Sequence, residues 1–476
     1  MQYETVIGLE VHTELATQSK IFCACTTKFG GAANTHVCPV CSGMPGSLPV
    51  LNRAVVEYAI RTGLATHCAI TRSTKFDRKN YFYPDLPKAY QISQLYQPIC
   101  TDGWISITGA EGEAKRINIR EIHMEEDAGK LVHDPWEDAS LADFNRCGVP
   151  LLEIVSQPEL RSASEAIDYI ERLKAILEYT GVSDCKMQEG SLRADVNLSV
   201  RPVGSPVLGT RTEMKNINSL RAIARAIAAE TARQIELIED GGRVVQETRR
   251  WDDDAGESHA MRSKEDAQDY KYFPEPDLPP IEISEAQIEK IRAALPELPD
   301  DKKRRYIEAF GLPEYDTGIL TGSIHLVRLF ERTAQFCGDP KEAANWILGE
   351  VLRLLQQTQT LPEDMQFDPD ALGKLILLVK QNTINRGTAK KVFAEVFQHN
   401  VEPESYVKAN NLALVTDDGA IRETLRQMLA ANEKSAAEYR AGKEQALQYL
   451  IGQGMRALRG QAPAQEVTRI LKEMLA

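Results

Sequence analysis

A chain of 476 residues is too long for one hydrophobic core of ordinary size, so we expect two or three domains. Its composition, 43% hydrophobic and 26% charged, is typical of a soluble globular protein, and no apolar run approaches the length needed to cross a bilayer. The net charge of −13 argues against a generic binder of polyanions but is compatible with a local basic patch. The first residues lack the basic and apolar regions of a secretory signal, so we expect a cytoplasmic protein with no membrane partner.

The first predicted strand covers residues 5–15, TVIGLEVHTEL, in which apolar and polar side chains alternate. Strict alternation is typical of a strand, because successive side chains point to opposite faces of a sheet. One face carries the apolar residues Ile7, Leu9, Val11 and Leu15, and the other carries the polar residues Glu10, His12 and Glu14. The second face therefore brings carboxylates and an imidazole together, which points to a metal or a catalytic site.

Four of the nine cysteines lie in the next segment, with the spacing C-x-C and, after twelve residues, C-x2-C. Two close pairs of thiolates suit tetrahedral zinc, and four protein ligands make a closed, structural site. We therefore predict a zinc knuckle over residues 23–41, formed by Cys23, Cys25, Cys38 and Cys41. The alternatives are small buried side chains, a redox pair, or His36 in place of one cysteine. The other five cysteines are expected in the core: Cys68, Cys100, Cys147, Cys185 and Cys337.

Three later segments repeat the pattern of one apolar and one polar face, namely INIREIHMEEDAGK (117–130), SLRADVNLSVRP (191–202) and TRTEMKNIN (210–218). Their polar sets are Glu121, His123 and Glu125; Arg193, Asp195 and Asn197; and Arg211, Glu213 and Lys215. Four strands of this kind predict a largely antiparallel sheet with one packed side.

The polar faces of these strands permit two interpretations. On a solvated face, opposite charges simply pair across neighbouring strands. However, Asp, Asn, His and Glu are residue types that bind hard cations, and magnesium takes oxygen ligands while leaving positions for phosphate oxygens. The arginines and lysine among them suit recognition of phosphate or carboxylate. We therefore predict a metal and nucleotide site on one face of the sheet, with cross-strand pairing as the alternative.

Several catalytic motifs are absent from the sequence. It contains no G-x4-G-K-[ST] loop, no G-x-G-x-x-G after a strand and no H-E-x-x-H. If ATP binds, it is held through metal and side chains rather than by a phosphate-binding loop. There is also no G-x-S-x-G elbow or amidase-like Gly/Ser segment, so the chain has no covalent serine route to hydrolyse an amide.

The pattern of the sequence changes near residue 280, from segments typical of strands and turns to segments typical of helices. Residues 270–280, YKYFPEPDLPP, contain four prolines that suit an extended connection, and they echo NYFYPDLP at residues 80–87. Helical periodicity follows, with Ser284 predicted as one N-cap and with Asp339 and Pro340 as cap and first turn of another helix.

From Tyr406 to Ala476 the chain predicts short amphipathic helices with ten Lys/Arg and eight Asp/Glu. This mildly basic segment suggests a small RNA-contacting domain, although its charge alone favours a plain helical bundle with a solvated face.

The motifs taken together resemble a known family, the B subunits of the glutamyl/aspartyl-tRNA amidotransferase. The resemblance runs through the whole chain, and DFNRCGVPLLEI is its most specific block. The other matching motifs are IGLEVHTEL, CPVCSGMPGSLPVLN, KNYFYPDLPKAYQISQ, IHMEEDAGK, EGSLRADVNLSVRP, RTEMKNINSL, DYKYFPEPDLPP and IGQGMRALRGQAPAQEVTRILKEML.

The resemblance implies a heterotrimer of A, B and C subunits, in which the A subunit releases ammonia from glutamine. The B subunit would use ATP and magnesium to phosphorylate the side-chain carboxylate of misacylated Glu-tRNA(Gln) or Asp-tRNA(Asn). Ammonia would then displace phosphate and give Gln-tRNA(Gln) or Asn-tRNA(Asn). The implied fold is α+β: a mainly antiparallel cradle domain similar to glutamine synthetase and guanido kinases (1–290), an all-α helical domain (291–405) and a tail that contacts tRNA (406–476).

The resemblance also assigns roles to residues. The magnesium ligands would be His12, Glu10, Glu125, Glu153 and Glu213. The catalytic set would be Glu10, His12, Glu125, Asp195 and Lys215. The groups that hold ATP phosphates or the aminoacyl end would be Arg193, Arg211, Lys215 and Lys79. The four clustered cysteines match a structural zinc knuckle found in part of the family.

Two other functional classes stay open at this point. The first is a non-catalytic zinc-ribbon scaffold that binds tRNA and whose acidic faces pair with partner subunits. The second is a two-metal hydrolase, which would act without ATP and leaves the basic tail unexplained. Formation of ADP that depends on misacylated tRNA separates the kinase from both.

Overall fold

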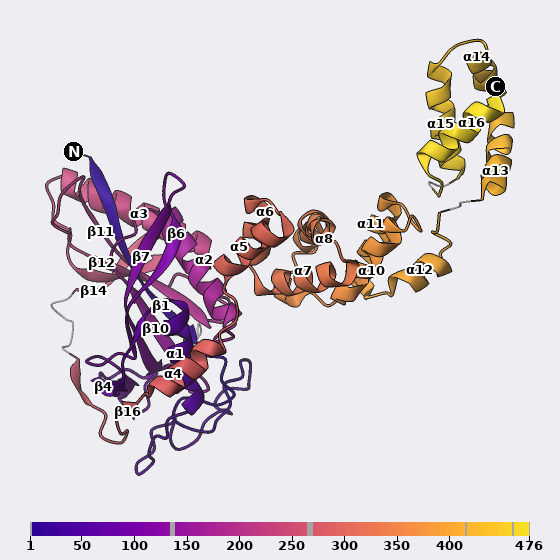
Figure 1. The fold of residues 1–476 in the computed structure, drawn as a ribbon. Coiled ribbons are helices and arrows are strands. Elements are labelled where there is room, and N and C mark those ends of the chain that lie inside the picture. The colour runs from indigo at the N-terminus through magenta and orange to yellow at the C-terminus, as the bar shows by residue number, and fades with distance from the viewer. Residues whose placement is uncertain (1, 134–138, 264–269, 415–416, 459–460, 476) are drawn as a thin grey trace. The chain divides into compact units, whose positions relative to one another are not determined.

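The structure is a computed structural model that describes residues 2–133, 139–263, 270–414, 417–458 and 461–475. The chain forms two compact units, Met1–Pro299 and Asp300–Ala476. The first is a mixture of strands and helices and the second is helical (Figure 1). Among the described residues, no helix has both the length and the apolar character needed to span a membrane.

A nine-stranded sheet dominates the first unit. In order across the sheet, its strands are β14 (Glu257–Ser263), β13 (Glu247–Asp252), β12 (Thr212–Lys215), β11 (Leu192–Pro202), β1 (Tyr3–Glu14), β10 (Pro150–Ser156), β7 (Ala114–Glu126), β6 (Cys100–Thr108) and β2 (Ala69–Ile70). All neighbouring pairs run antiparallel except β12 and β13, which are parallel. The predicted largely antiparallel sheet is confirmed.

Helices cover one face of this sheet. They are α1 (Arg53–Ala65), α2 (Ala163–Tyr179) and α3 (Leu220–Glu239). The helix α1 packs on β6 and β7, α2 on β6, and α3 on β11, and their apolar residues form one continuous core with the strands. Asn52, Ser162 and Ser219 cap the three helices by accepting a backbone N–H of the first turn. The helix α4 (Glu285–Ala293) begins at Ser284 in the same way, as predicted.

The alternation of the first strand is confirmed. Ile7 and Val11 are 0% exposed and Leu9 is 1% exposed, because they point into the core beneath the helices. Glu10 and His12 keep partial exposure on the opposite face. The helix-covered face therefore supplies rigidity, and the other face supplies the polar groups.

A β-bulge in β7 decides which face the acidic residues of that strand occupy. Ile117 and Ile119 belong to the core, but farther along the strand the core residues are Ile122 and Met124, which have the opposite parity. The register with β10 shifts where Val155 pairs with Glu121 and Ser156 pairs with Ile119, and Arg120 is the extra residue between them. Uninterrupted alternation would have placed Glu125 in the apolar core.

A small sheet adjoins the end of β7. Its strands are β15 (Lys271–Pro274), β4 (Asp77–Asn80) and β5 (Tyr90–Ser93), all antiparallel, and β5 packs against β7. The two echoing Tyr/Pro segments noted in the sequence thus lie side by side, and the rings of Tyr81 and Tyr270 are 5.4 Å apart between centroids. Two further strand pairs are β16 (Ile281–Glu282) with β3 (Ser73–Thr74), and β8 (Lys130–His133) with β9 (Ser140–Asp143).

The second unit contains two hydrophobic cores. One, with Phe330, Trp346 and Phe393 among its members, is formed by the segment up to about Leu412. Its helices are α5 (Pro299–Phe310), α6 (Glu314–Thr321), α7 (Ile324–Cys337), α8 (Pro340–Trp346), the π-helix η2 (Ile347–Val351), α9 (Leu352–Thr358), the 3-10 helix η3 (Pro362–Asp364), α10 (Pro369–Lys380), α11 (Arg386–His399) and α12 (Pro403–Ala409). Asp339 caps α8 and Pro340 opens it, as predicted.

The other core joins the last four helices, around Leu425, Leu450 and Val467. These helices are α13 (Asp418–Ala430), α14 (Glu433–Arg440), α15 (Gln445–Ala457) and α16 (Ala464–Leu475). The predicted short amphipathic helices are therefore confirmed. The α+β class with a helical C-terminal region is also confirmed, whereas the likeness of the first unit to glutamine synthetase and guanido kinases stays a prediction.

Candidate active site

Strand register brings the predicted polar residues together on the face of the sheet opposite the helices. Glu10 of β1 pairs with Asp195 of β11, and His12 lies between Glu153 of β10 and Arg193 of β11. Side chains at paired positions point to the same face, about 5 Å apart. A cross-strand row of polar groups therefore forms although the residues come from three separate strands, β1, β10 and β11.

The first acid group consists of His12, Glu125 and Glu153. One ligand atom from each residue lies within 4.8 Å of those of the other two. His12 Nε2 is 3.6 Å from Glu125 Oε1, and Ser93 Oγ of β5 donates to Glu125 Oε2 at 3.2 Å. Glu125 is only 4% exposed, so its charge is largely removed from water.

The electrostatics of the first acid group are unfavourable to its own carboxylates. Burial raises the pKa of Glu125, and the nearby Glu153 raises it further, while His12 and Lys79 oppose the rise only in part. Two carboxylates and an imidazole with a shared open centre are donors that a divalent cation accepts. A bound cation would supply the positive charge that the surrounding side chains do not.

The second acid group consists of Glu10, Asp195 and Glu213, again with ligand atoms within 4.8 Å of one another. Here a protein cation is present, because Lys215 Nζ lies 2.7 Å from Asp195 Oδ2 and 2.9 Å from Glu213 Oε1. Asn197 Nδ2 donates to Glu10 Oε1 at 3.0 Å.

The pKa values in the second acid group follow the position of Lys215. Burial opposes ionisation of Glu213, but Lys215 and a hydrogen bond from Thr248 outweigh it and lower its pKa. For Glu10 the balance is reversed: burial, Glu153 and Glu213 raise its pKa, and Lys215 offsets them only in part. The two groups are therefore similar in composition and different in charge balance.

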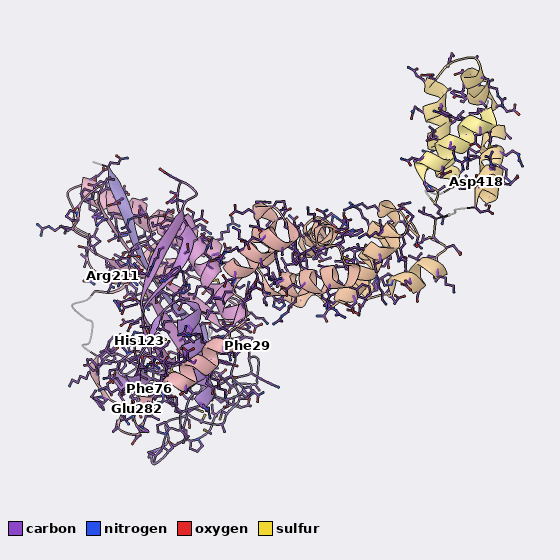
Figure 2. The ribbon with its side chains drawn as sticks, in the orientation of Figure 1. Phe29, Phe76, His123, Arg211, Glu282 and Asp418 are labelled. Atoms are coloured by element: carbon purple, nitrogen blue, oxygen red, sulfur yellow. The ribbon has the colours of Figure 1, made fainter. Side chains whose placement is uncertain are left out.

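The three predicted basic residues outside these groups have different surroundings. Arg193 Nη2 pairs with Asp127 Oδ2 at 2.6 Å, and its Nε is buried without a hydrogen-bond partner among the residues that the structure describes. Arg211 precedes β12, is exposed and, among the described residues, makes no ion pair, although its charge helps to lower the pKa of Glu213. Figure 2 labels Arg211 and His123, which both belong to the first unit.

Lys79 reaches the site from the small sheet. Its Nζ lies 5.6 Å from the centroid of the Tyr81 ring and 5.1 Å from that of Tyr270. Burial disfavours its charge, but Glu125 and the neighbouring tyrosines outweigh that effect and raise its pKa. Lys79 therefore stays an ammonium that faces the first acid group.

Several residues that support the site were not singled out from the sequence. Ser93 and Thr248 fix the carboxylates of Glu125 and Glu213, and Asp127 is shared between Arg193 and Arg146, whose Nε lies 3.3 Å away. Ser93 and Thr248 carry no local signal, because each acquires its partner only through packing of distant strands. Asp127 directly follows the IHMEE motif, and that position was the one available hint.

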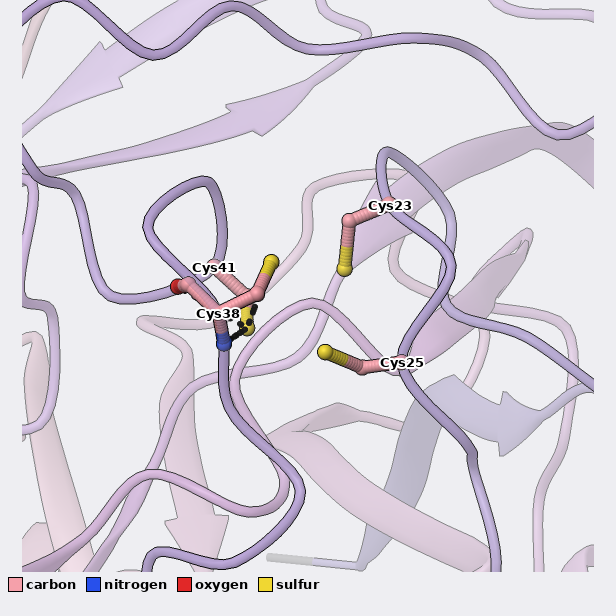
Figure 3. Close-up of side chains that lie close together, drawn as sticks. All are labelled: Cys23, Cys25, Cys38 and Cys41. Carbon is pink, nitrogen blue, oxygen red and sulfur yellow. Dashed lines mark hydrogen bonds between the residues drawn. The ribbon is translucent and has the colours of Figure 1, made fainter.

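The four clustered cysteines form a separate group near the N-terminus of the same unit (Figure 3). Lys20 N donates to Cys25 O at 2.9 Å and a bridge between Ser19 and Thr26 closes this first turn, whereas the second turn is closed by Ser42 N donating to Cys38 O at 3.0 Å. The sulfurs of Cys38 and Cys41 are 3.9 Å apart. Four thiolates about 2.3 Å from a zinc ion lie about 3.8 Å from one another, so the arrangement fits the ion.

The surroundings of the four clustered cysteines favour deprotonation of one of them, Cys41. A hydrogen bond from Cys23 is the main cause that lowers the pKa of Cys41 to about 4, and Lys20 Nζ, 3.5 Å from Cys41 Sγ, contributes. His36 is not part of this group; its carbonyl accepts a hydrogen bond from Lys20. The five other cysteines are buried, as predicted.

Comparison with known proteins gives a uniform result. Residues 5–289 match the family described as the GatB/GatE catalytic domain, and residues 328–475 match the GatB domain. A protein of Lachnoclostridium phytofermentans, named as the B subunit of an aspartyl/glutamyl-tRNA(Asn/Gln) amidotransferase, is 59% identical over 474 residues, which are 100% of this chain and 99% of that protein. Proteins of the same name from Caldicellulosiruptor bescii and Thermoanaerobacter pseudethanolicus are 57% and 52% identical, over 100% of this chain and 99% and 100% of theirs.

Proposed function

The chain belongs to the family of aspartyl/glutamyl-tRNA(Asn/Gln) amidotransferase B subunits, and from this premise we propose that it activates and amidates the acid carried by a misacylated tRNA. As a B subunit it is part of a glutamine-hydrolysing ligase. The proposed substrates are Glu-tRNA(Gln) and Asp-tRNA(Asn), with ATP as phosphoryl donor and magnesium as cofactor. The proposed setting is the cytoplasm.

The observation that carries this proposal is the first acid group. His12, Glu125 and Glu153 converge from three strands, and burial together with the charge of Glu153 raises the pKa of Glu125 more than His12 and Lys79 lower it. Phosphoryl transfer depends mostly on positioning and on neutralising phosphate charge, which a magnesium ion supplies when bound. The second acid group lies on the same face of the sheet. Its carboxylates would bind a further metal ion, and Lys215 would bind a phosphate group of ATP.

The chemistry explains why phosphorylation is needed. A carboxylate is a poor acyl donor because its leaving group would be oxide. When a carboxylate oxygen attacks the terminal phosphorus of ATP, the new P–O bond forms as the bond to ADP breaks. Ammonia then attacks the acyl carbon of this mixed anhydride, phosphate leaves, and one proton is lost to give the neutral amide.

The ammonia is proposed to come from glutamine, hydrolysed by an A subunit of a heterotrimer that also contains a C subunit. This chain shows no amidase motif of its own, which agrees with a separate glutaminase. Water must be excluded from the activated acid, because it would otherwise hydrolyse the intermediate. Among the groups that surround the acidic face, Arg193, Arg211 and Lys79 are proposed to hold ATP phosphates or the aminoacyl end.

The experiment that tests the function measures ADP. The assembled enzyme is incubated with ATP, magnesium, ammonium chloride and tRNA that is misacylated, correctly acylated or uncharged. The proposal expects ADP and amidated tRNA in equal amounts only with misacylated tRNA. The proposal would be contradicted if ADP formed equally with misacylated, correctly acylated and uncharged tRNA, or if amidation occurred without ATP. An absence of turnover with retained tRNA binding would favour the scaffold interpretation, and turnover without ATP the hydrolase.

We also propose that the four cysteines hold a structural zinc ion. The 3.9 Å spacing of two sulfurs and the lowered pKa of Cys41 support this. Replacing Cys38 and Cys41 with serine should remove zinc, measured by metal analysis, and lower the melting temperature of the same sample. Retention of one equivalent of zinc in the double variant would refute the assignment.

The division into a cradle domain (1–290), a helical domain (291–405) and a tRNA-contacting tail (406–476) stays part of the proposal. In the tail, Arg469 is paired with Asp418, Glu466 and Glu473. Among the described residues of its last four helices, the Lys and Arg side chains without an ion pair are Lys434, Arg440, Arg456 and Lys472. Truncation from residue 406 should weaken tRNA binding while the trimer still assembles, as measured by filter binding and size-exclusion chromatography.

A further inference from the structure

A cluster of hydrogen-bond donors lies on the small sheet beside the acidic face. Lys79 of β4 pairs with Tyr272 of β15 in the antiparallel register. Tyr81 and Tyr270 flank this pair, and both rings contact the Lys79 ammonium through their faces. Tyr270 and Tyr272 also contact each other, with ring centroids 6.4 Å apart. We call Lys79, Tyr81, Tyr270 and Tyr272 the donor cluster.

The donors of this cluster are unused within the described part of the chain. The Lys79 ammonium and the three phenol groups make no hydrogen bond or salt bridge there. An ammonium offers three N–H donors and each phenol offers one O–H. Lys79, Tyr81 and Tyr272 are partly buried, whereas Tyr270 is 44% exposed. Partly buried donors that converge without an acceptor indicate a ligand that brings the acceptor.

The donor cluster faces the first acid group. Lys79 pairs with Gln91 and Asp77 pairs with Ser93, so Lys79 and Ser93 share one face of the small sheet. Ser93 is the residue whose hydroxyl donates to Glu125. The same face therefore presents Lys79 and Tyr272 toward Glu125 and Glu153.

The protonation of the cluster suits it to an anion. Burial raises the pKa of Tyr272, and the charges of Glu153 and Glu125 raise it further. Burial likewise raises the pKa of Tyr81 to about 12. The phenols therefore stay protonated as donors near neutral pH, and Lys79 stays charged. Together they present one positive charge and several donors.

We propose that Lys79, Tyr81 and Tyr272 bind the side-chain carboxylate of the aminoacyl group that is to be activated. This inference rests on the proposed function and names the subsite for its acid substrate. A single positive charge with neutral donors balances a monoanionic carboxylate, whereas a triphosphate carries several charges and would be drawn to the cations that the acid groups are proposed to hold. The subsite places the carboxylate opposite the residues that would hold the metal.

The test compares two tRNA ligands that differ only in the group under discussion. Glu-tRNA(Gln) and Gln-tRNA(Gln), both with the amino acid joined through a stable amide link, present a carboxylate and a neutral amide. Their dissociation constants are measured on the assembled enzyme for wild type, Tyr81→Phe, Tyr272→Phe and Lys79→Met. Tyr→Phe removes one oxygen and keeps the ring, so the fold is preserved.

The matched control is Tyr90→Phe. Tyr90 pairs with Asn80 on the other face of the small sheet, where its ring contacts Arg78 with 4.3 Å from the guanidinium carbon to the centroid. We expect each of Tyr81→Phe and Tyr272→Phe to weaken Glu-tRNA(Gln) by about 5- to 10-fold, and Lys79→Met by about 10- to 100-fold. Binding of Gln-tRNA(Gln) should be unchanged in all of them, and Tyr90→Phe should change neither ligand.

Three outcomes would overturn the inference. Equal weakening of both tRNAs would show that the cluster does not sense the carboxylate. Unchanged binding of Glu-tRNA(Gln) together with a raised KM for ATP would assign the cluster to the nucleotide phosphates. If tRNA binding and the KM for ATP are unchanged in all variants, the donor cluster binds neither the carboxylate nor ATP. In each of these cases the proposed function survives if wild type forms ADP in response to misacylated tRNA; its own failure appears as loss of that response.

Discussion

The two acid groups of the first unit offer an instructive comparison. Each contains three potential ligands with donor atoms within 4.8 Å of one another, and both stand on the same face of one sheet. The first group, with Glu125 at its centre, is more deeply buried and depends on His12 and Lys79 for partial compensation. The second has Lys215 within 3 Å of two of its carboxylates.

The difference shows that donor geometry alone does not describe a metal site. Burial raises the pKa of Glu125, whereas Lys215 outweighs burial and lowers that of Glu213. An internal cation reduces the gain from a bound one, because the same negative charge is already balanced. We therefore expect the first group to bind a divalent cation more tightly than the second.

The largest expected effect is on catalysis, from Glu125→Gln. This change keeps the size of the side chain and removes the charge at the centre of the first group. ATP-dependent amidation by the assembled enzyme should fall by at least about 100-fold, because the magnesium ion proposed to neutralise the phosphates would lose a ligand. Initial rates of Gln-tRNA formation measure this.

Glutamine hydrolysis by the partner subunit should persist in Glu125→Gln, which shows that the complex is assembled. Glu57→Gln on α1, an exposed carboxylate paired with Arg53, is the control and should retain full activity. Full amidation by Glu125→Gln would remove the first group from the mechanism.

A smaller effect is expected on stability, from Lys215→Met. The change would make the second group resemble the first by leaving Asp195 and Glu213 without their cation. Because the Lys215 side chain is 42% exposed, solvent screens the pair, and we expect a loss of about 1–2 kcal/mol in the free energy of unfolding. Denaturant unfolding without added metal measures it.

Magnesium sharpens the same test. It should restore more stability to Lys215→Met than it adds to wild type, since the variant has more uncompensated charge. Lys186→Met, which removes a partly exposed partner of Glu189, is the control and should lose no more than a few tenths of a kcal/mol. An identical magnesium response in wild type and Lys215→Met would contradict the role given to Lys215.

The smallest effects should be opposite in sign. In protein stripped of metal at neutral pH, Glu125→Gln should raise the free energy of unfolding by about 1 kcal/mol and Glu213→Gln should lower it by about as much. The reason is that ionising Glu125 opposes folding, whereas ionising Glu213 beside Lys215 favours it. Parallel denaturation curves of the two variants measure the difference.

The pH dependence carries the same signs. The pKa of Glu125 is raised in the folded state, so stability is lost as the pH rises above the unfolded value of this group. The pKa of Glu213 is lowered, so its contribution is present above its unfolded value and is lost as the pH falls through the folded value. Variants that shift stability in the same direction would show that the two groups do not differ in charge balance.

Many features of the molecule could be predicted from residues that are close together in the sequence. The alternation of residues 5–15 predicted both faces of β1, and the cap residues Ser284 and Asp339 were predicted correctly. The cysteine spacing predicted which four thiols meet, because two short turns need only one loop to unite them. The sequence also indicated Glu10, His12, Glu125, Glu153 and Glu213 as one set, through polar parity and family resemblance.

Non-local pairing decided the rest. The sequence indicated one set of metal ligands, but in the structure these residues divide into two acid groups. Asp195 belongs to the second group, with Glu10 and Glu213. No single segment of the sequence shows which strands become neighbours in the sheet. For the same reason, no single segment shows that Lys215 contacts Asp195 as well as Glu213. The echo between residues 80–87 and 270–280 was visible in the sequence, but only the sheet shows that the two segments meet and place Lys79 opposite the acids.

The sequence by itself therefore determined the strands, the helix caps, the sulfur cluster and the chemical character of the acidic face, because each depends on residues close in the chain. Only the tertiary structure decided the orientation of Glu125 and the separation of the acid groups. The bulge at Arg120 is the physical reason for the first, since one extra residue exchanges the faces of all side chains beyond it. For the second it is the register between strands that are distant in sequence, since pairing fixes which side chains are neighbours.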